Sequence, residues 1–406
     1  MFPQPDRLKV MHIISDLDVG GGQAVVRTLA KYLALEECVP IVCTFRDGLL
    51  RPDIEKLGIA VEVLPSRRYS IAAFPLFVAD MARILRSLIR LVRKHQVDVV
   101  QTHLLRTLDF LVLLLRGTKP LRAVFWTFHS ANLELTEEQL GRHKWLLKPK
   151  RQAHRGLYRF ASRWVTGLIV VSDQVRESAI ELIGPSIRGK TTMIPNGCDM
   201  DQYAQPVDRA QIRRQLGLPP DCRLIAMVGT LRKVKGHCYL IEAMPALLPR
   251  YPDLHVLLIG DGELKASLEL SVCELGLGKR VHFLGSRSDV PQLLAASDLF
   301  VLPSLWEGLS MALLEAMATG LPIVASAVSG TVQAIKPDEG GLLVPPGDVP
   351  ALVSAIDQLL SDPDRARAMG AVSRRRVELE FSARKQAREH IALYRRALGT
   401  PVGQAS

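Results

Sequence analysis

Short apolar runs alternate with segments of helical periodicity along most of the chain. Near the N-terminus, the apolar run at residues 8–15 leads through a glycine-rich turn into a helical segment at residues 24–35. A strand, a glycine loop and a helix in this order are typical of the first turn of a doubly wound α/β domain. Further strands are expected at residues 41–45, 61–64, 97–102, 123–128 and 165–171.

The alternation begins again after residue 220. Strands are predicted at residues 224–229, 255–260, 281–284, 298–302 and 323–326. Helices are predicted between them, at residues 236–248, 290–296 and 309–319. The pattern therefore predicts two doubly wound domains, which a length of 406 residues also favours. Ligands of such folds bind at the carboxyl ends of the strands.

The segment around Glu307 is the most informative part of the chain. Glu307 and Gly308 follow an apolar strand, and a helix that we predict to begin at Gly308 carries Glu315 two turns on. Free N–H groups at a helix start attract anions, and a carboxylate accepts hydrogen bonds from hydroxyl groups. A phosphate beside vicinal hydroxyls describes a nucleotide sugar. The alternative is an ordinary surface loop before a helix with one solvated glutamate.

Two further groups of residues are candidates for chemistry. Arg232 and Lys235 lie on the loop after the first strand of the second half, where cations would stabilise the charge that develops on a departing diphosphate. The alternative is a solvated basic turn. His129 follows the strand at residues 123–128, and His103 ends the strand before it. A lone histidine is more often structural, but an imidazole at a strand tip can hydrogen-bond a sugar hydroxyl.

Six motifs in order resemble those of the family 4 retaining glycosyltransferases of the GT-B fold. They are Ile194-Pro-Asn-Gly-Cys-Asp199, Val228-Gly-Thr-Leu-Arg-Lys-Val-Lys-Gly236, Leu258-Ile-Gly-Asp-Gly262, Val281-His-Phe-Leu-Gly285, Glu307-x7-Glu315 and Gly341-Leu-Leu-Val-Pro-Pro-Gly-Asp348. The resemblance implies two facing Rossmann-like domains with a cleft between them. The acceptor-binding domain would span residues 1–197, with a C-terminal helix at about 383–406 crossing back onto it. The donor-binding domain would span residues 198–382.

The resemblance also implies roles for individual residues. The catalytic residues would be His129 and Glu307 at the transferred sugar and Arg232 and Lys235 at the diphosphate. The donor-binding residues would be Gly229, Thr230, Arg232, Lys235, Gly308, Leu309, Ser310 and Glu315. Thr230 stands where the family has arginine, so Arg232 is expected to supply the guanidinium. A loop near the diphosphate and the acceptor would hold Gly20, Gly21, Gly22 and His103.

No cofactor is expected beside the nucleotide-sugar substrate, a UDP- or GDP-sugar. Asp16-Leu-Asp18 imitates the D-x-D metal motif of another glycosyltransferase fold, but it lies on the wrong element, so we expect no essential metal. Two alternatives to a hexosyl-transferring enzyme remain. One is a different GT-B activity such as a nucleotide-sugar epimerase, which the intact Lys-Gly loop and paired glutamates disfavour. The other is a non-catalytic protein that binds sugar nucleotides, which Thr230 keeps open.

The net charge lies entirely on the first half of the chain. Residues 1–190 contain 29 basic and 18 acidic residues, whereas the remaining 23 of each sign cancel. Arg83, Arg86, Arg90 and Arg93 share one face of a helix predicted at residues 75–96, and a second basic run spans residues 142–163. A basic amphipathic helix can lie on anionic lipid, although its arginines can also be merely solvated.

These features bear on partners and location. No recognised nucleic-acid module accompanies the basic residues, so nucleic acid is not an expected partner. Six scattered cysteines without a C-x-x-C pair favour a reducing compartment. No secretion signal or spanning segment is apparent. We therefore expect a cytoplasmic protein, peripheral on the inner face of the cell membrane, with a glycolipid or oligosaccharide acceptor; a small soluble acceptor is the alternative.

Overall fold

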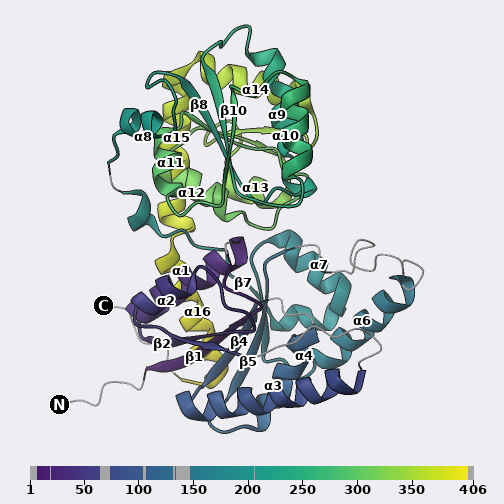
Figure 1. The fold of residues 1–406 in the computed structure, drawn as a ribbon. Coiled ribbons are helices and arrows are strands. Elements are labelled where there is room, and N and C mark those ends of the chain that lie inside the picture. Colours follow the sequence, from purple (N-terminus) through teal and green to yellow (C-terminus); the bar gives the residue numbers. More distant parts are fainter. Residues whose placement is uncertain are drawn as a thin grey trace, which may run out of the picture. The chain divides into compact units, whose positions relative to one another are not determined.

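The chain forms two compact units. The structure, a computed structural model, describes residues 7–18, 20–64, 74–103, 107–130, 133, 147–204 and 206–400. Unit 1 comprises Met1–Asn196 and Arg384–Ser406, and unit 2 comprises Gly197–Ala383. Both are layered α/β structures with helices on the faces of a twisted sheet (Figure 1).

In unit 1, seven parallel strands run in the order β3-β2-β1-β4-β5-β6-β7 among the described residues. The strands are β1 (Leu8–Ile14), β2 (Cys38–Thr44), β3 (Ala60–Val63), β4 (Val99–His103), β5 (Ala123–Phe128), β6 (Gly167–Val170) and β7 (Thr191–Met193). The helices are α1 (Gly21–Leu35), α2 (Arg51–Lys56), α3 (Phe74–His95), α4 (Thr107–Leu113), η2 (Leu114–Gly117), α6 (Leu147–Ala161), α7 (Asp173–Ile183), η4 (Pro185–Lys190) and α16 (Ala383–Leu398).

In unit 2, six parallel strands run in the order β10-β9-β8-β11-β12-β13 among the described residues. The strands are β8 (Arg223–Val228), β9 (Leu254–Ile259), β10 (Val281–Gly285), β11 (Leu299–Leu302), β12 (Ile323–Ser326) and β13 (Leu342–Val344). The helices are η5 (Met200–Tyr203), α8 (Arg209–Gln215), η6 (Lys233–Lys235), α9 (His237–Leu247), α10 (Lys265–Glu274), α11 (Val290–Ala296), α12 (Met311–Thr319), α13 (Ser329–Ala334), α14 (Val349–Ser361) and α15 (Pro363–Glu380).

The predicted fold class, two Rossmann-like parallel-sheet domains, is confirmed. In each sheet the strand order reverses once, between β1 and β4 and between β8 and β11. Ligands of open α/β sheets bind beyond the carboxyl ends of the strands at such a switch point. The loops after these four strands contain most of the predicted site residues, so the topology gathers them at one edge of each sheet.

Helix α3 packs its apolar face on the sheet and leaves its basic face exposed. Ile84, Leu88 and Val92 are buried in the core against β1, β2, β4 and β5. The four arginines on its other face, Arg83, Arg86, Arg90 and Arg93, are exposed. Arg83 pairs with the buried Asp80 one turn earlier at 3.2 Å. None of the helices in the described ranges has the length and apolar composition needed to cross a bilayer.

Helix α12 begins later than predicted. Its first residue is Met311, and Ser310 caps it by accepting a hydrogen bond from the backbone N–H of Leu313 at 3.4 Å. The prediction of a helix start at Gly308 is therefore wrong. Serine is a strong N-cap because its hydroxyl replaces a missing backbone acceptor, which glycine cannot do. Gly308 instead lies in the preceding turn, against Gly330, where an added Cβ would meet the Gly308 carbonyl oxygen at 1.6 Å.

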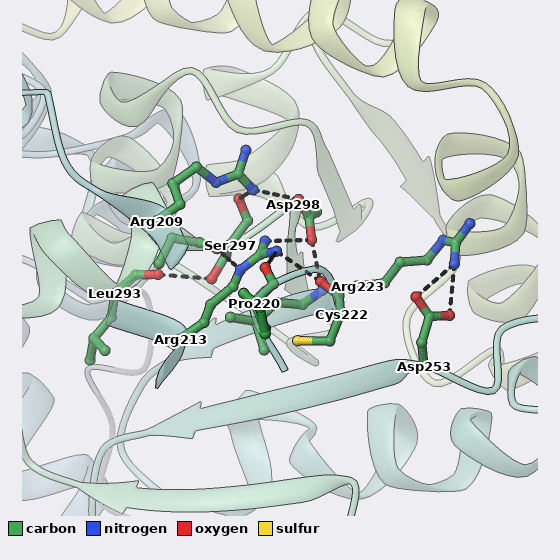
Figure 2. Close-up of polar contacts among 11 residues, drawn as sticks. Arg209, Arg213, Pro220, Cys222, Arg223, Asp253, Leu293, Ser297 and Asp298 are labelled. Carbon is green, nitrogen blue, oxygen red and sulfur yellow. Dashed lines mark hydrogen bonds and ion pairs between the residues drawn. The ribbon is translucent and has the colours of Figure 1, made fainter. Parts of the chain in front are cut away.

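A buried arginine fastens α8 to the amino edge of the second sheet (Figure 2). Arg213 donates to Asp298 and to the carbonyl oxygens of Pro220 and Cys222, each at 2.9 Å, and to that of Ala296 at 3.0 Å. Asp298 also accepts from the Leu224 N–H at 2.8 Å. Every donor of this guanidinium except one N–H thus has an acceptor. The cluster joins the starts of β8 and β11, opposite the edge that bears the candidate site.

Candidate functional site

The glycine of the Lys235-Gly236 pair is required by the local backbone. Its φ is +71°, and an added Cβ would lie 2.0 Å from the Pro303 carbonyl oxygen. Both the left-handed conformation and the close approach exclude a side chain. The approach brings the loop after β8 against the turn after β11, where the Leu305 N–H donates to the Val234 carbonyl at 2.8 Å.

Lys235 and Glu307 meet at this crossing. The Lys235 Nζ donates to Glu307 Oε1 at 2.7 Å, and the Ser304 hydroxyl donates to the same oxygen at 2.8 Å. The side chains are 21% and 8% exposed for the lysine and the glutamate, so the ion pair is largely shielded from water. A shielded ammonium with one carboxylate partner keeps two further N–H donors for an anion. Two of the four predicted catalytic residues therefore lie in direct contact.

The rest of the loop is shaped by the next motif. At Gly260 an added Cβ would meet the Gly229 carbonyl oxygen at 2.1 Å, and at Gly262 it would meet that of Leu231 at 2.6 Å. These glycines let the loop of residues 229–235 lie flat against the chain after β9. Arg232 is exposed on that loop and forms no ion pair within the described part of the chain. Its guanidinium is therefore available to a ligand, and its replacement of the family's arginine at Thr230 stays a prediction.

Glu315 lies on α12, half-buried. Burial raises the pKa of Glu315 to about 7, and a side-chain hydrogen bond to Tyr203 opposes the shift. Helix η5, which carries Tyr203, packs against α12.

The glycine of the Pro-Asn-Gly motif lies where two backbone segments cross. An added Cβ at Gly197 would meet the Cα of residue 383 at 2.6 Å. The Pro-Asn-Gly motif thus fits a close crossing of two backbone segments.

The predicted residues of unit 1 gather at the carboxyl edge of its sheet. His129 follows β5, and its Nε2 lies 2.9 Å from Nδ1 of His103, the last residue of β4. The other His103 nitrogen lies 3.1 Å from His12 Nδ1, so neither ring nitrogen of His103 is left for another partner. Burial lowers the pKa of His129 to about 4, and a hydrogen bond to Asn196 opposes the shift.

The glycine loop leads directly into α1. Gly20 is the residue before the helix, and no side chain caps it. An added Cβ at Gly21 or Gly22 would meet nothing within 4 Å, so these two glycines border open space within unit 1. Next to them Asp16 accepts from Gln23 at 2.7 Å and from Arg46 at 3.0 Å. Asp16 is therefore tied to protein donors.

Comparison with known proteins assigns the family. Residues 19–202 match the model described as glycosyltransferase family 4, and residues 208–376 match that of the glycosyl transferases group 1. The UDP-Gal:alpha-D-GlcNAc-diphosphoundecaprenol alpha-1,3-galactosyltransferase of Escherichia coli is 31% identical over 293 residues, which cover 70% of this chain and 72% of that protein. The chain belongs to glycosyltransferase family 4.

Two further relatives of this glycosyltransferase are informative. The lipopolysaccharide core biosynthesis mannosyltransferase LpsB of Rhizobium meliloti is 30% identical over 251 residues, 60% of this chain and 69% of LpsB. The structure of Anabaena HepE in complex with UDP-glucose matches with a TM-score of 0.78 at 22% identity, over 95% of this chain and 100% of HepE. The latter supports the GT-B fold.

Sequence reasoning missed two residues that contact the predicted ones. Ser304 orients Glu307, and His12 extends the pair of His103 and His129. Their position in the sequence could have indicated them, because each lies on or shortly after a strand that borders a switch point. No three His, Cys, Asp or Glu side chains in the described ranges are grouped so that they could hold a metal ion. That the reaction needs no metal stays a prediction.

Proposed function

We propose that this glycosyltransferase moves a hexosyl group from a UDP- or GDP-sugar to a glycolipid or polysaccharide intermediate, with retention of the anomeric configuration. The observation that carries the proposal is the Lys235–Glu307–Ser304 cluster at the switch point of unit 2. It offers an ammonium to a diphosphate and a carboxylate to sugar hydroxyls. Glu315 on the following helix is proposed to accept hydrogen bonds from the ribose.

The proposed chemistry places charge stabilisation on unit 2. As the bond between the anomeric carbon and the diphosphate breaks, Lys235 and Arg232 stabilise the charge that appears on the leaving group. In the front-face route that the family resemblance implies, the leaving phosphate takes the proton of the acceptor hydroxyl. No second carboxylate on the opposite face is then required, unlike in retaining glycosidases. Glu307 is proposed to contact the transferred sugar, and His129 keeps the role at that sugar that the family resemblance implies.

The proposed acceptor and location rest on the relatives of the chain and on its charge. The E. coli relative acts on a diphosphoundecaprenol-linked sugar by its name, and LpsB acts in lipopolysaccharide core biosynthesis. We therefore infer a lipid-linked acceptor that unit 1 binds at the cytosolic face of a membrane. In unit 1, Leu157, Phe160 and Trp164 are exposed among basic residues at the end of α6, and Arg163 lies over the Phe160 ring at 5.7 Å.

Donor binding and product stereochemistry test the proposal. Thermal unfolding with UDP, GDP and ADP should show stabilisation by one of the first two, because a ligand that binds only the folded state raises its stability. Lys235→Ala should weaken that diphosphate about 10- to 100-fold, since it removes a charge-assisted contact. NMR of the fresh product should show the configuration of the donor. A product with inverted configuration would rule out the proposed retaining mechanism. If folded Lys235→Ala bound the diphosphate with wild-type affinity, the assignment of the donor site would be wrong.

A further inference from the structure

Tyr203 ends the short helix η5, and none of the motifs predicts a role for it. Helix η5 packs against both α11 and α12. The Tyr203 side chain forms a hydrogen bond with the carboxyl group of Glu315 on α12. When that group is ionised the tyrosine hydroxyl must be the donor, because a carboxylate has only acceptor oxygens. Tyr203 therefore contacts the residue that is proposed to bind the ribose.

The segment that carries Tyr203 is fastened at its start. Cys198 exchanges two backbone hydrogen bonds with the segment 381–383, one donated at 2.7 Å and one accepted at 2.9 Å. Within η5, the Gln202 amide donates to the buried carboxylate of Asp199 at 2.7 Å. These contacts lie within unit 2 and fix the turn between the backbone crossing and Tyr203.

The end of the segment is fastened to the helix that supports α12. The guanidinium of Arg374 on α15 donates to the Tyr203 carbonyl oxygen at 3.4 Å. The Arg374 side chain passes Gly320 at the end of α12, where an added Cβ would lie 3.7 Å from the arginine Cδ. Helix α15 also packs closely on α12, since an added Cβ at Gly370 would meet the Gly320 carbonyl oxygen at 2.0 Å. Both the backbone and the side chain of Tyr203 are thus tied to the surroundings of Glu315.

We propose that Tyr203 is a positioning residue for donor binding, whose hydroxyl orients the Glu315 carboxylate so that its remaining lone pairs receive the two ribose hydroxyls. The inference rests on the proposed function, in which Glu315 binds the ribose. A carboxylate has about four lone pairs, so one bond from the tyrosine leaves acceptors for a vicinal diol. A glutamate side chain loses much rotamer freedom when a ligand orders it. A hydrogen bond that orients the side chain beforehand reduces this cost and strengthens binding.

Removal of hydroxyl groups from the protein and from the ligand tests this coupling. Tyr203→Phe removes only the donor, and calorimetry compares UDP and GDP with their 2′,3′-dideoxy analogues. At pH 8.5 the Glu315 carboxyl group is mostly ionised, although burial raises its pKa to about 7. For the nucleoside diphosphate that binds, the variant should weaken the ribonucleotide about tenfold and the dideoxy analogue less than about twofold. An oriented carboxylate strengthens binding only where hydroxyls are present to bond it.

Tyr251→Phe is the matched control. The Tyr251 hydroxyl also donates to a carboxylate of unit 2, that of Asp357, at 2.8 Å. Tyr251 precedes β9, whereas the site residues follow their strands, so this pair lies at the opposite edge of the sheet. The control should bind every nucleotide as the wild type does. In steady-state assays Tyr203→Phe should raise the KM of the donor about tenfold and change kcat less than about twofold, because the ribose lies away from the reacting carbon.

The outcomes separate this inference from the proposed function. The wild type should prefer the ribonucleotide to its dideoxy analogue, and Glu315→Ala should lose that preference. If Glu315→Ala keeps it, the ribose site of the proposed function is wrong. If Glu315→Ala loses it and folded Tyr203→Phe keeps it in full, Tyr203 does not position Glu315. Equal weakening of both nucleotides by Tyr203→Phe would likewise overturn the inference, because a general structural defect does not distinguish them.

Discussion

At the scale of single residues, Glu315 is a carboxyl group that folding moves away from water. Its pKa is raised from 4.5 to about 7 by burial. Between these two values the folded protein keeps a proton that the unfolded chain releases. The contribution of Glu315 to the free energy of unfolding is therefore greatest below pH about 4.5. It falls by up to about 3 kcal/mol as pH rises to about 7 and is level beyond.

Glu315→Gln should remove this pH dependence. The variant should gain stability relative to the wild type as pH rises from 5 to 8, because the amide has no charge to bury. Denaturant unfolding at a series of pH values measures the difference. Glu269→Gln, at an exposed position of α10, is the matched control and should follow the wild type throughout. Parallel curves for Glu315→Gln and the wild type would show that the carboxyl group is not held protonated.

Residue identity alone predicted part of this site. Lys235, Glu307 and Glu315 follow from motifs whose spacing places them after particular strands. The ion pair of Lys235 with Glu307 did not follow, because it depends on how close Gly236 comes to Pro303. The contacts of His103 with His12 and His129 could not be predicted either, because the register of β1, β4 and β5 aligns residues that are far apart in the chain.

At the scale of elements, the apolar periodicity predicted nearly all strands within one to three residues. Helix starts were less predictable, because they depend on local capping. Helix α12 starts at Met311 because Ser310 supplies a cap, and α1 starts at Gly21, before the first apolar residue of its pattern. The anchoring of α8 by Arg213 has no motif, since its acceptors are mostly carbonyl oxygens that any sequence supplies.

Arg213→Met should destabilise unit 2 by about 3 kcal/mol. The substitution leaves three buried carbonyl oxygens and part of Asp298 without their donor, and breaking a buried pair from one side is costly. Denaturant unfolding measures the loss, with hydrogen exchange of β8 and β11 showing that unit 2 is affected. Arg223→Met is the control: its pair with Asp253 is 44% and 39% exposed, so its loss should cost less than about 1 kcal/mol. Equal effects of the two would refute the anchoring role.

At the scale of the whole molecule, charge and exposed apolar groups coincide on unit 1. All of the excess of 11 positive charges lies within residues 1–190. The exposed arginines of α3 and the exposed Leu157, Phe160 and Trp164 belong to the same unit. Residues 142–146, which begin the second basic run, lie outside the described part of the chain. Basic and aromatic groups together are what a membrane interface attracts.

Unit 1 should accordingly bind anionic membranes reversibly. Each basic residue near an anionic leaflet contributes about 1 kcal/mol, so three or four suffice for binding without an anchor. The protein should sediment with vesicles that contain anionic lipid and not with neutral ones. Salt at 0.5 M should release it, because the screening length falls to about 4–5 Å.

Replacing the four exposed arginines of α3 by glutamine should weaken vesicle binding at least about tenfold, while affinity for the nucleoside diphosphate in unit 2 stays unchanged. The matched control replaces four exposed basic residues of unit 2, Arg214, Lys279, Lys336 and Arg365, by glutamine. It removes the same charge from the protein, so it separates a local surface from a general effect of net charge. If both quadruple variants lose binding equally, only the total charge matters. Sedimentation that does not depend on anionic lipid would instead favour a small soluble acceptor.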